Sequence, residues 1–211
     1  MCYTYENSIT DLESGVTYKK SKLSIQQRDA IRRRNKELEK FGEKWQFYYT
    51  NGFDHDLLPI VTMEKPDEIQ FYNWGLVPIW VRDKDQADKL QNETLNAKSE
   101  TVFDLPSFKG SIFTKRCLVP AHGFYEWRHL HGKKYPYHVM IKHDDFPDGT
   151  REFCFGGIYA NWIDKATGEV RNTFSIITVP ANKVMSKVHN VKQRMPLILF
   201  KEDESVWLQD D

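Results

Sequence analysis

One stretch near the middle of the chain indicates the fold most clearly, Arg116-Cys117-Leu118-Val119-Pro120-Ala121-His122-Gly123-Phe124-Tyr125-Glu126-Trp127. Its β-branched and aromatic residues are typical of strands. Alternation along a strand places Glu126 on the same face as Phe124 and Arg128, opposite its two aromatic neighbours. A carboxylate that loses water at such a position is either neutralised or paired with a cation. Glu126 is therefore a candidate general acid or base, or the partner of a nearby arginine.

Strand patterns continue on both sides of this stretch. They cover residues 57–63, 68–74, 137–141, 153–162 and 173–179, and turn residues predict hairpins across Gly132 and Gly168. Residues 21–44 and 203–209 have helical patterns, whereas residues 82–110 resemble a long loop. We therefore expect an α+β fold with a largely antiparallel, barrel-like sheet and a few flanking helices. Residues 1–211 are expected to form a single domain.

Composition excludes several classes of protein. The chain has 30 Lys and Arg against 30 Asp and Glu, which argues against a protein that coats DNA through a global positive charge. The charge is uneven, because residues 19–44 hold ten cations against four acids and residues 200–211 hold one against five. Three scattered cysteines with no CxxC pair predict neither a disulfide framework nor a zinc ribbon. With no apolar run of membrane-spanning length and no signal peptide, a cytoplasmic protein without metal is expected.

Cys2 follows the initiator methionine directly. Removal of Met1 leaves an α-amine and a thiol on the same residue, and the amine has a reference pKa near 7.7–8.0. Its neutral form attacks an aldehyde to give a Schiff base, and the thiol then closes a five-membered thiazolidine ring. An internal cysteine such as Cys117 or Cys154 lacks that amine, and both are expected to be buried core thiols. By position alone Cys2 is either such a nucleophile or incidental.

Other residues are weaker candidates when taken singly. His189 lies in a polar stretch that leads into an apolar run, where it is either a proton shuttle or a surface residue. Asn96 has the donors and the acceptor needed to orient a substrate. Trp74 and Trp80 flank Gly75-Leu76-Val77-Pro78-Ile79, and each is either a core residue or a platform for stacking a base.

Together and in this order, these segments resemble the SRAP (SOS-response-associated peptidase) family of abasic-site processing proteins. The matching segments span nearly the whole chain. They are Met1-Cys2, Trp74–Trp80, Asn96–Thr101, Arg116–Trp127, Ile176–Thr178 with Ala181-Asn182, and His189 with Arg194-Met195-Pro196.

The resemblance implies one β-rich domain with a basic groove for single-stranded DNA, in a monomer that needs no cofactor. It implies that Cys2 crosslinks to the ring-opened aldehyde of an abasic site, that Asn96 orients the sugar or the amine, and that Glu126 is the acid or base. His189 would assist ring opening and crosslink reversal. Trp74 or Trp80 would stack a flanking base, and phosphates would meet the cations Lys98, Arg116 and Arg194.

The chain departs from the family pattern at several positions. Tyr3 and Thr4 replace the usual Gly-Arg after the cysteine, Lys98 replaces an arginine, and residues 190–193 separate His189 from Arg194. The chain also ends at Asp211, before a further segment usual in the family. Two other functions stay open: a cysteine peptidase or amidase with an N-terminal nucleophile, and a non-catalytic single-strand binder.

Overall fold

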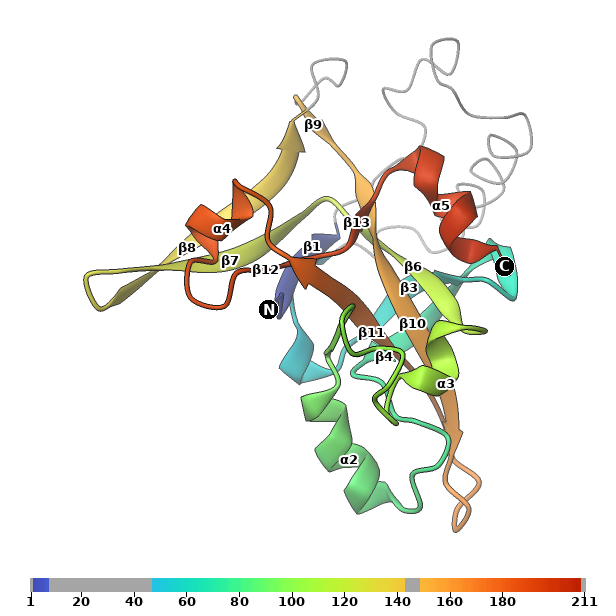
Figure 1. The fold of residues 1–211 in the computed structure, drawn as a ribbon. Coiled ribbons are helices and arrows are strands. Elements are labelled where there is room, and N and C mark those ends of the chain that lie inside the picture. Colours follow the sequence, from blue (N-terminus) through green and yellow to red (C-terminus); the bar gives the residue numbers. More distant parts are fainter. Residues whose placement is uncertain (1, 8–46, 143–148, 210–211) are drawn as a thin grey trace.

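Strands form most of the fold in the computed structural model, which describes residues 2–7, 47–142 and 149–209 (Figure 1). The helix expected over residues 21–44 lies outside these ranges. The strands are β1 (Thr4–Asn7), β2 (Phe47–Asn51), β3 (Leu57–Thr62), β4 (Lys65–Trp74), β5 (Asn96–Lys98), β6 (Arg116–Ala121), β7 (Gly123–Leu130), β8 (Lys133–Lys142), β9 (Thr150–Arg151), β10 (Phe153–Ile163), β11 (Val170–Pro180), β12 (Arg194–Pro196) and β13 (Ile198–Leu199). The helices are the 3-10 turn η2 (Gly52–Asp54), α2 (Lys84–Glu93), α3 (Lys109–Ile112), α4 (Met185–Val188) and α5 (Lys201–Leu208).

Five strands close into a barrel. The long strand β10 pairs with β6 through its first half and with β11 through its second half, while β11 also pairs with β4 and thereby completes the ring through β3. Among the described pairs only those of β11 with β4 and β5 are parallel. This confirms the predicted α+β fold, and the hairpins expected across Gly132 and Gly168 are both present.

A second sheet, in the order β2-β1-β7-β8-β9, grows out of the barrel where β6 continues into β7. At this bend Gly123 leaves room for the side chain of His138, because a Cβ there would lie 2.4 Å from the imidazole Nε2 and would force the ring to shift. Strand β1 pairs only with the first residues of β7, where Tyr5 lies opposite Phe124. The topology therefore places the N-terminus beside the strand that carries Glu126.

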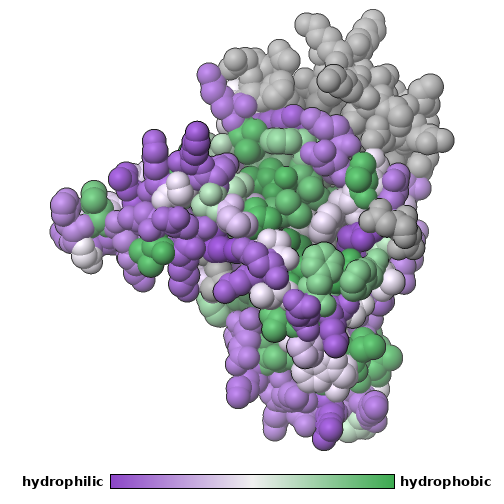
Figure 2. All heavy atoms as spheres, viewed as in Figure 1, coloured by the Kyte–Doolittle hydropathy of each residue, from purple (hydrophilic) through white to green (hydrophobic). Residues whose placement is uncertain are grey.

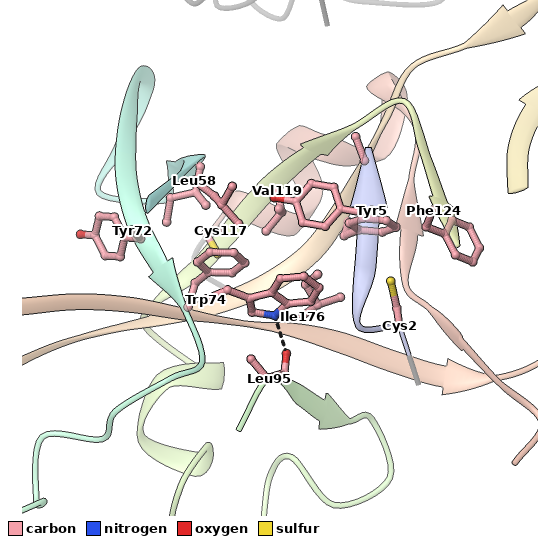
Figure 3. Packing of buried hydrophobic residues seen from close by; sticks show 14 of the residues in the cluster. Cys2, Tyr5, Leu58, Tyr72, Trp74, Leu95, Cys117, Val119, Phe124 and Ile176 are labelled. Carbon is pink, nitrogen blue, oxygen red and sulfur yellow. Dashed lines mark hydrogen bonds between the residues drawn. The ribbon is translucent and has the colours of Figure 1, made fainter. Parts of the chain in front are cut away.

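The main core lies where the barrel meets the second sheet (Figure 3). Trp74 is fully buried, stacks on Phe174 and contacts Tyr5 edge-on. Its indole N–H donates to the carbonyl of Leu95 over 2.8 Å. Cys2 and Tyr5 belong to the same buried cluster, so two of the residues at the start of the described chain are part of the core.

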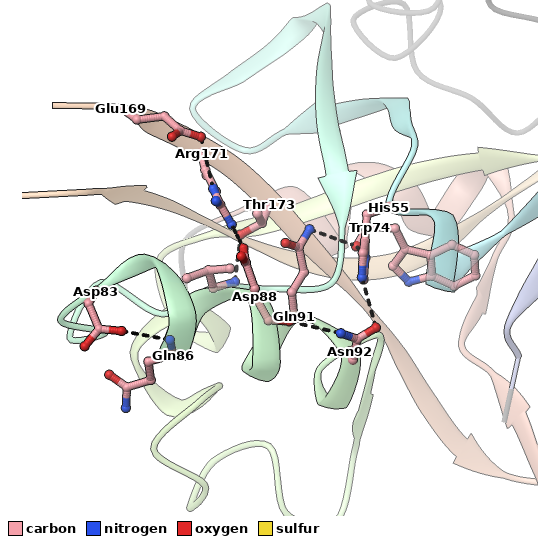
Figure 4. Close-up of polar contacts among 11 residues, drawn as sticks. His55, Trp74, Asp83, Gln86, Asp88, Gln91, Asn92, Glu169, Arg171 and Thr173 are labelled. Carbon is pink, nitrogen blue, oxygen red and sulfur yellow. Dashed lines mark hydrogen bonds and ion pairs between the residues drawn. The ribbon is translucent and has the colours of Figure 1, made fainter. Parts of the chain in front are cut away.

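The stretch at residues 82–110 is not the long loop that we expected, because it holds α2, β5 and α3. Asp83 caps α2 by accepting a hydrogen bond from a first-turn backbone N–H. An ion pair between Asp88 and Arg171 of β11 then fastens the helix to the barrel (Figure 4). No helix within the described ranges is both long enough and apolar enough to cross a membrane.

Candidate active site

Cys2 is held in place by Asn96, which comes from a distant part of the chain. The amide Nδ2 of Asn96 donates to the backbone carbonyl of Cys2 over 2.9 Å, and both residues are buried. Asn96 has this position because β5 pairs with β11, with Asn96 opposite Ile176. The thiol of Cys2 donates to the carbonyl of Thr4 at 3.6 Å. Parallel pairing in the barrel thus brings together two of the predicted site residues.

The thiol of Cys2 is kept protonated. Burial raises its pKa well above the ordinary value for cysteine, and the negative charge of Glu126 raises the pKa further. The same two causes raise the pKa of the Tyr3 phenol. The carboxylate of Glu126 therefore acts electrostatically on both N-terminal residues.

Glu126 and His189 form a buried pair. Glu126 lies on β7 with 2% of its surface exposed, and His189 ends α4 with 7% exposed, so its interpretation as a surface residue is wrong. The imidazole Nδ1 lies 3.8 Å from the Glu126 Oε1 and 2.8 Å from the carbonyl oxygen of Arg194. Because a carbonyl only accepts hydrogen bonds, Nδ1 carries a proton, and in the neutral ring Nε2 is the nitrogen that accepts one.

A cavity of about 350 Å³ opens beside this pair. Its walls come from β7, β8, the N-terminus and the segment after α4, and they comprise Tyr3, Glu126, Trp127, His129, Lys134, His189, Val191 and Lys192. Cys2 is fully covered and does not line the cavity, but its neighbour Tyr3 does. Cys2 therefore directly precedes a cavity-lining residue in the sequence, while its own side chain is covered.

The structure places the two predicted stacking tryptophans away from this cavity. Trp74 has no exposed surface, so it is a core residue and has no open face for a base. Trp80 is 46% exposed, but its indole N–H donates to the carbonyl of Pro106 at 3.0 Å and its ring is absent from the cavity lining. Trp127 is the tryptophan that does line the cavity. The alternation of β7 had placed it opposite Glu126 without indicating this role.

Two of the three predicted phosphate-binding cations have other partners. The guanidinium of Arg116 donates to the carbonyls of Trp207 and Gln209 and lies over the Trp207 indole, so this side chain anchors α5 instead.

The guanidinium of Arg194 is paired with Glu100 and donates to the carbonyl of Thr178. The bond from Arg194 lowers the pKa of Glu100 to about 2. Lys98 on β5 is exposed.

The cavity contains cations that the sequence analysis missed, Lys134 and Lys192, together with His129. Lys134 belonged to a predicted turn, and Lys192 to a spacer between two motif residues, so neither had a recognisable pattern. Cys117 and Cys154 are buried thiols as expected. Within the described part of the chain, no three His, Cys, Asp or Glu side chains are grouped so that they could hold a metal ion.

Comparison with known proteins gives consistent relatives. Abasic site processing protein YoqW of Bacillus subtilis is 34% identical over 161 residues, which span 76% of this chain and 66% of YoqW. Abasic site processing protein HMCES of Gallus gallus is 38% identical over 150 residues, which span 64% of this chain and 43% of that protein. The chain thus matches less than two thirds of the length of either relative.

Solved structures and a family model agree with these relatives. A crystal structure of a Bacteroides thetaiotaomicron protein matches with a TM-score of 0.76 and 35% identity, and the match covers 100% of this chain and 82% of that one. The family model described as SOS response associated peptidase (SRAP) matches residues 18–211. The chain therefore belongs to the SRAP family.

Proposed function

We propose that this protein processes abasic sites in single-stranded DNA by forming a covalent crosslink through Cys2. The observation that carries the proposal is the position of Cys2, which Asn96 holds at the N-terminus within the electrostatic reach of Glu126. The names of the relatives YoqW and HMCES, which are abasic site processing proteins, support the abasic site as the substrate.

The chemistry needs the α-amine that removal of Met1 exposes. The neutral amine attacks C1′ of the ring-opened sugar, a C–N bond forms, and one water leaves as the Schiff base is made. The thiol sulfur then adds to the same carbon, and the thiol proton ends on the nitrogen. The product is a thiazolidine in which both groups of Cys2 are bound to the former aldehyde carbon.

Asn96 is suited to orient the reacting groups. Its Nδ2 fixes the carbonyl of Cys2, while its Oδ1 is buried and has no hydrogen-bond partner among the described residues. A buried acceptor without a donor destabilises the fold by about 1–3 kcal/mol. The ammonium or amine of processed Cys2, or a hydroxyl of the sugar, would supply the missing donor.

The raised pKa of the Cys2 thiol favours a mechanism in which the amine reacts first. A cysteine peptidase requires a thiolate, which cationic neighbours stabilise by lowering the pKa. Here burial and the Glu126 carboxylate act in the opposite direction. In the chain that retains Met1, the hydrogen bond to the Thr4 carbonyl and the N-terminal ammonium lower the pKa of the thiol by less than these two causes raise it, so a peptidase acting through Cys2 is the weaker alternative.

Glu126 and His189 are placed to move the protons that these steps release. Ring opening of the sugar requires a base to take the proton of its hydroxyl group, and loss of water requires an acid. We assign the hydroxyl proton to Nε2 of His189, which returns it to the ring oxygen as the sugar opens, whereas the Glu126 carboxylate carries the protons of the amine to the oxygen that leaves as water. The 3.8 Å separation between the two side chains allows them to share these roles.

The remaining parts of the proposal concern context. We propose that residues 1–211 act as one SRAP domain, as a monomer in the cytoplasm and on nucleoid DNA, without a metal or cofactor. A sugar without a base needs no unstacking, which favours damaged over intact nucleotides in the cavity. Trp127, rather than Trp74 or Trp80, is then the aromatic side chain beside the flanking base.

A crosslinking assay tests the proposal. Protein whose loss of Met1 has been verified by intact mass is mixed with single-stranded DNA that contains one enzymatically generated abasic site. We expect a heat-stable shifted band on a denaturing gel, and no such band with Cys2→Ala or with an uncleavable tetrahydrofuran analogue that lacks the aldehyde. A wild-type protein that gives no band, or a variant that gives an equal band, would overturn the proposal.

A further inference from the structure

We propose that Lys134 and Lys192 form a phosphate-binding subsite at the mouth of the cavity, where they hold the DNA backbone next to the abasic sugar. This inference rests on the proposed function and adds a binding site to it. Both lysines are exposed and both line the cavity, although Lys134 comes from β8 and Lys192 from the segment between α4 and β12. Within the described ranges neither ammonium belongs to an ion pair.

Around the cavity, the positive charges lie at the surface and the negative charge lies inside. The cations of the lining, Lys134 and Lys192, are both exposed, and residues 127–142 of the β7–β8 hairpin contain no Asp or Glu. The hairpin projects from the body of the protein, and its visible face is mostly hydrophilic (Figures 1 and 2). Glu126, the carboxylate of the cavity, is buried. A phosphodiester is therefore attracted to the mouth and repelled from Glu126, whereas an uncharged sugar can approach the carboxylate.

A side-chain clamp connects the two segments of the chain that carry the lysines. Asn190 lies beside β7, where its Oδ1 accepts from the backbone N–H of His129 over 3.0 Å and its Nδ2 donates to the His129 carbonyl over 2.8 Å. Strand β1 pairs with β7 only up to Phe124, so the following residues of β7 have an open edge on that side. The Asn190 amide bonds to this edge as a neighbouring strand would. Since Lys134 lies opposite His129 in the β7–β8 register, the clamp ties the segment of Lys192 to that of Lys134.

The loop that carries Lys192 is closed at its other end too. The backbone N–H of Gln193 donates to the carbonyl of His189 over 2.9 Å, and Nδ1 of His189 lies 2.8 Å from the carbonyl of Arg194. The four residues between His189 and Arg194 thus form a fixed turn on the catalytic histidine. This turn therefore supplies Lys192 as a cation of the cavity. Arg116 and Arg194 do not have this role, because both are bound to other partners.

Lysine is appropriate for a subsite that reads the backbone and not the sequence. Its ammonium is a compact point charge, which binds a phosphate oxygen without the forked geometry by which arginine recognises guanine. The proposed subsite therefore contributes affinity and register but no base preference, as a lesion-binding protein requires.

The test measures non-covalent binding to single-stranded DNA with one tetrahydrofuran site, by fluorescence anisotropy over a range of KCl concentrations. The variants are Lys134→Ala, Lys192→Ala and the double variant, and the matched control is Lys133→Ala. Lys133 is the neighbour of Lys134 on β8, is also exposed, and does not line the cavity.

We expect each cavity variant to weaken binding by about two- to fivefold, which is typical of one exposed charge pair. The slope of log affinity against log salt should become shallower by about 0.7 for each lost phosphate contact. The control should change affinity by less than about twofold, with its slope unchanged.

A second arm locates the phosphate. Neutral methylphosphonates replace the two phosphates that flank the tetrahydrofuran site, and they should weaken binding of the wild type while leaving binding of the double variant unchanged. Equal losses in both proteins, or equal effects of Lys133→Ala and Lys134→Ala, would overturn the subsite. If the wild type crosslinks to abasic DNA but the cavity variants bind as it does, only the subsite fails. If the wild type does not crosslink, the proposed function fails.

Discussion

The protein contains two buried cysteines that are close to a glutamate, and their surroundings differ. Cys2 lies in the field of Glu126, a carboxylate that lines the cavity and pairs with the buried His189. Cys154 of β10 donates its thiol hydrogen to Glu204 of α5 over 3.3 Å, and both of these residues are buried. We propose that the glutamate beside Cys2 serves the reaction, whereas the glutamate bonded to Cys154 serves the fold.

The hydrogen bond between Cys154 and Glu204 is one of several contacts that hold α5 against the barrel. Arg116 donates to carbonyls at the end of α5, and the Trp207 indole donates to the carbonyl of Cys117. Cys154 has neither a terminal amine nor a place in the cavity lining. Reactivity in our account therefore depends on the position of Cys2 at the chain start and on the cavity, and proximity to a carboxylate alone is insufficient.

The largest expected difference is between Cys2→Ala and Cys154→Ala. The first variant loses both the heat-stable adduct and the thiol that closes the ring. The second keeps adduct formation within about twofold of the wild type, because it leaves the amine, the thiol and the cavity intact. Gel quantification of crosslinked DNA measures both. If Cys154→Ala lost the adduct while remaining folded by circular dichroism, the comparison would be wrong.

The next largest difference is between Glu126→Gln and Glu204→Gln. Glutamine keeps the size of the side chain and an acceptor oxygen but cannot transfer a proton. We expect Glu126→Gln to slow adduct formation by about 10²- to 10⁴-fold, the usual contribution of a positioned acid or base. Glu204→Gln should leave the rate within about twofold. Single-turnover time courses provide both rates, and equal rates for the two variants would exclude Glu126 from proton transfer.

Trp74 and Trp127 extend the comparison from cysteines to aromatic residues. Trp74→Ala removes a fully buried ring and should lower the free energy of unfolding by about 3–5 kcal/mol, measured by urea denaturation. Trp127→Ala should instead weaken binding to tetrahydrofuran-containing DNA by about 1–3 kcal/mol. A Trp127 variant that unfolds as easily as the Trp74 variant but binds DNA normally would reverse these assignments.

The smallest expected effect is on stability, and its dependence on pH distinguishes Arg194 from Arg116. The bond from Arg194 holds the pKa of Glu100 near 2, below its usual 4.5, so this pair stabilises the fold above pH 4.5 and loses that effect as the pH falls towards 2. Because Glu100 is about half exposed, the contribution stays below about 1 kcal/mol. The stability difference between wild type and Glu100→Gln should vanish at low pH, whereas a pH-independent difference would contradict the pair.

Arg116 provides the control for that experiment. It donates to backbone carbonyls, which do not titrate, so Arg116→Ala should destabilise the protein by an amount that changes little over the same pH range.

Local patterns predicted most of the strands but not the α2 region. The barrel strands have β-branched and aromatic residues, and the hairpins have glycine turns, so both were evident from the sequence. Helix α2 buries only Ala87 and Gln91, and its apolar stripe is too narrow to recognise. Asp83 at its N-cap is the local signal for this helix within residues 82–110.

The site was predictable only where a residue belongs to a motif. Cys2, Asn96, Glu126 and His189 are within motifs, and the structure brings them near one another. The roles of Arg116 and Arg194 depend on partners some ninety residues away, which no local pattern encodes. The cavity lysines likewise meet only through the β7–β8 register and the Asn190 clamp.

The most direct test of the central claim is the mass and chemistry of the adduct itself. The wild-type protein is crosslinked to a short abasic oligonucleotide, digested, and analysed by peptide mass spectrometry. We predict a single modified peptide that begins at Cys2, has the summed mass of its two parts less one water, and resists thiol alkylation. A modification on a lysine, or on the Cys2 thiol of a chain that retains Met1, would contradict the account.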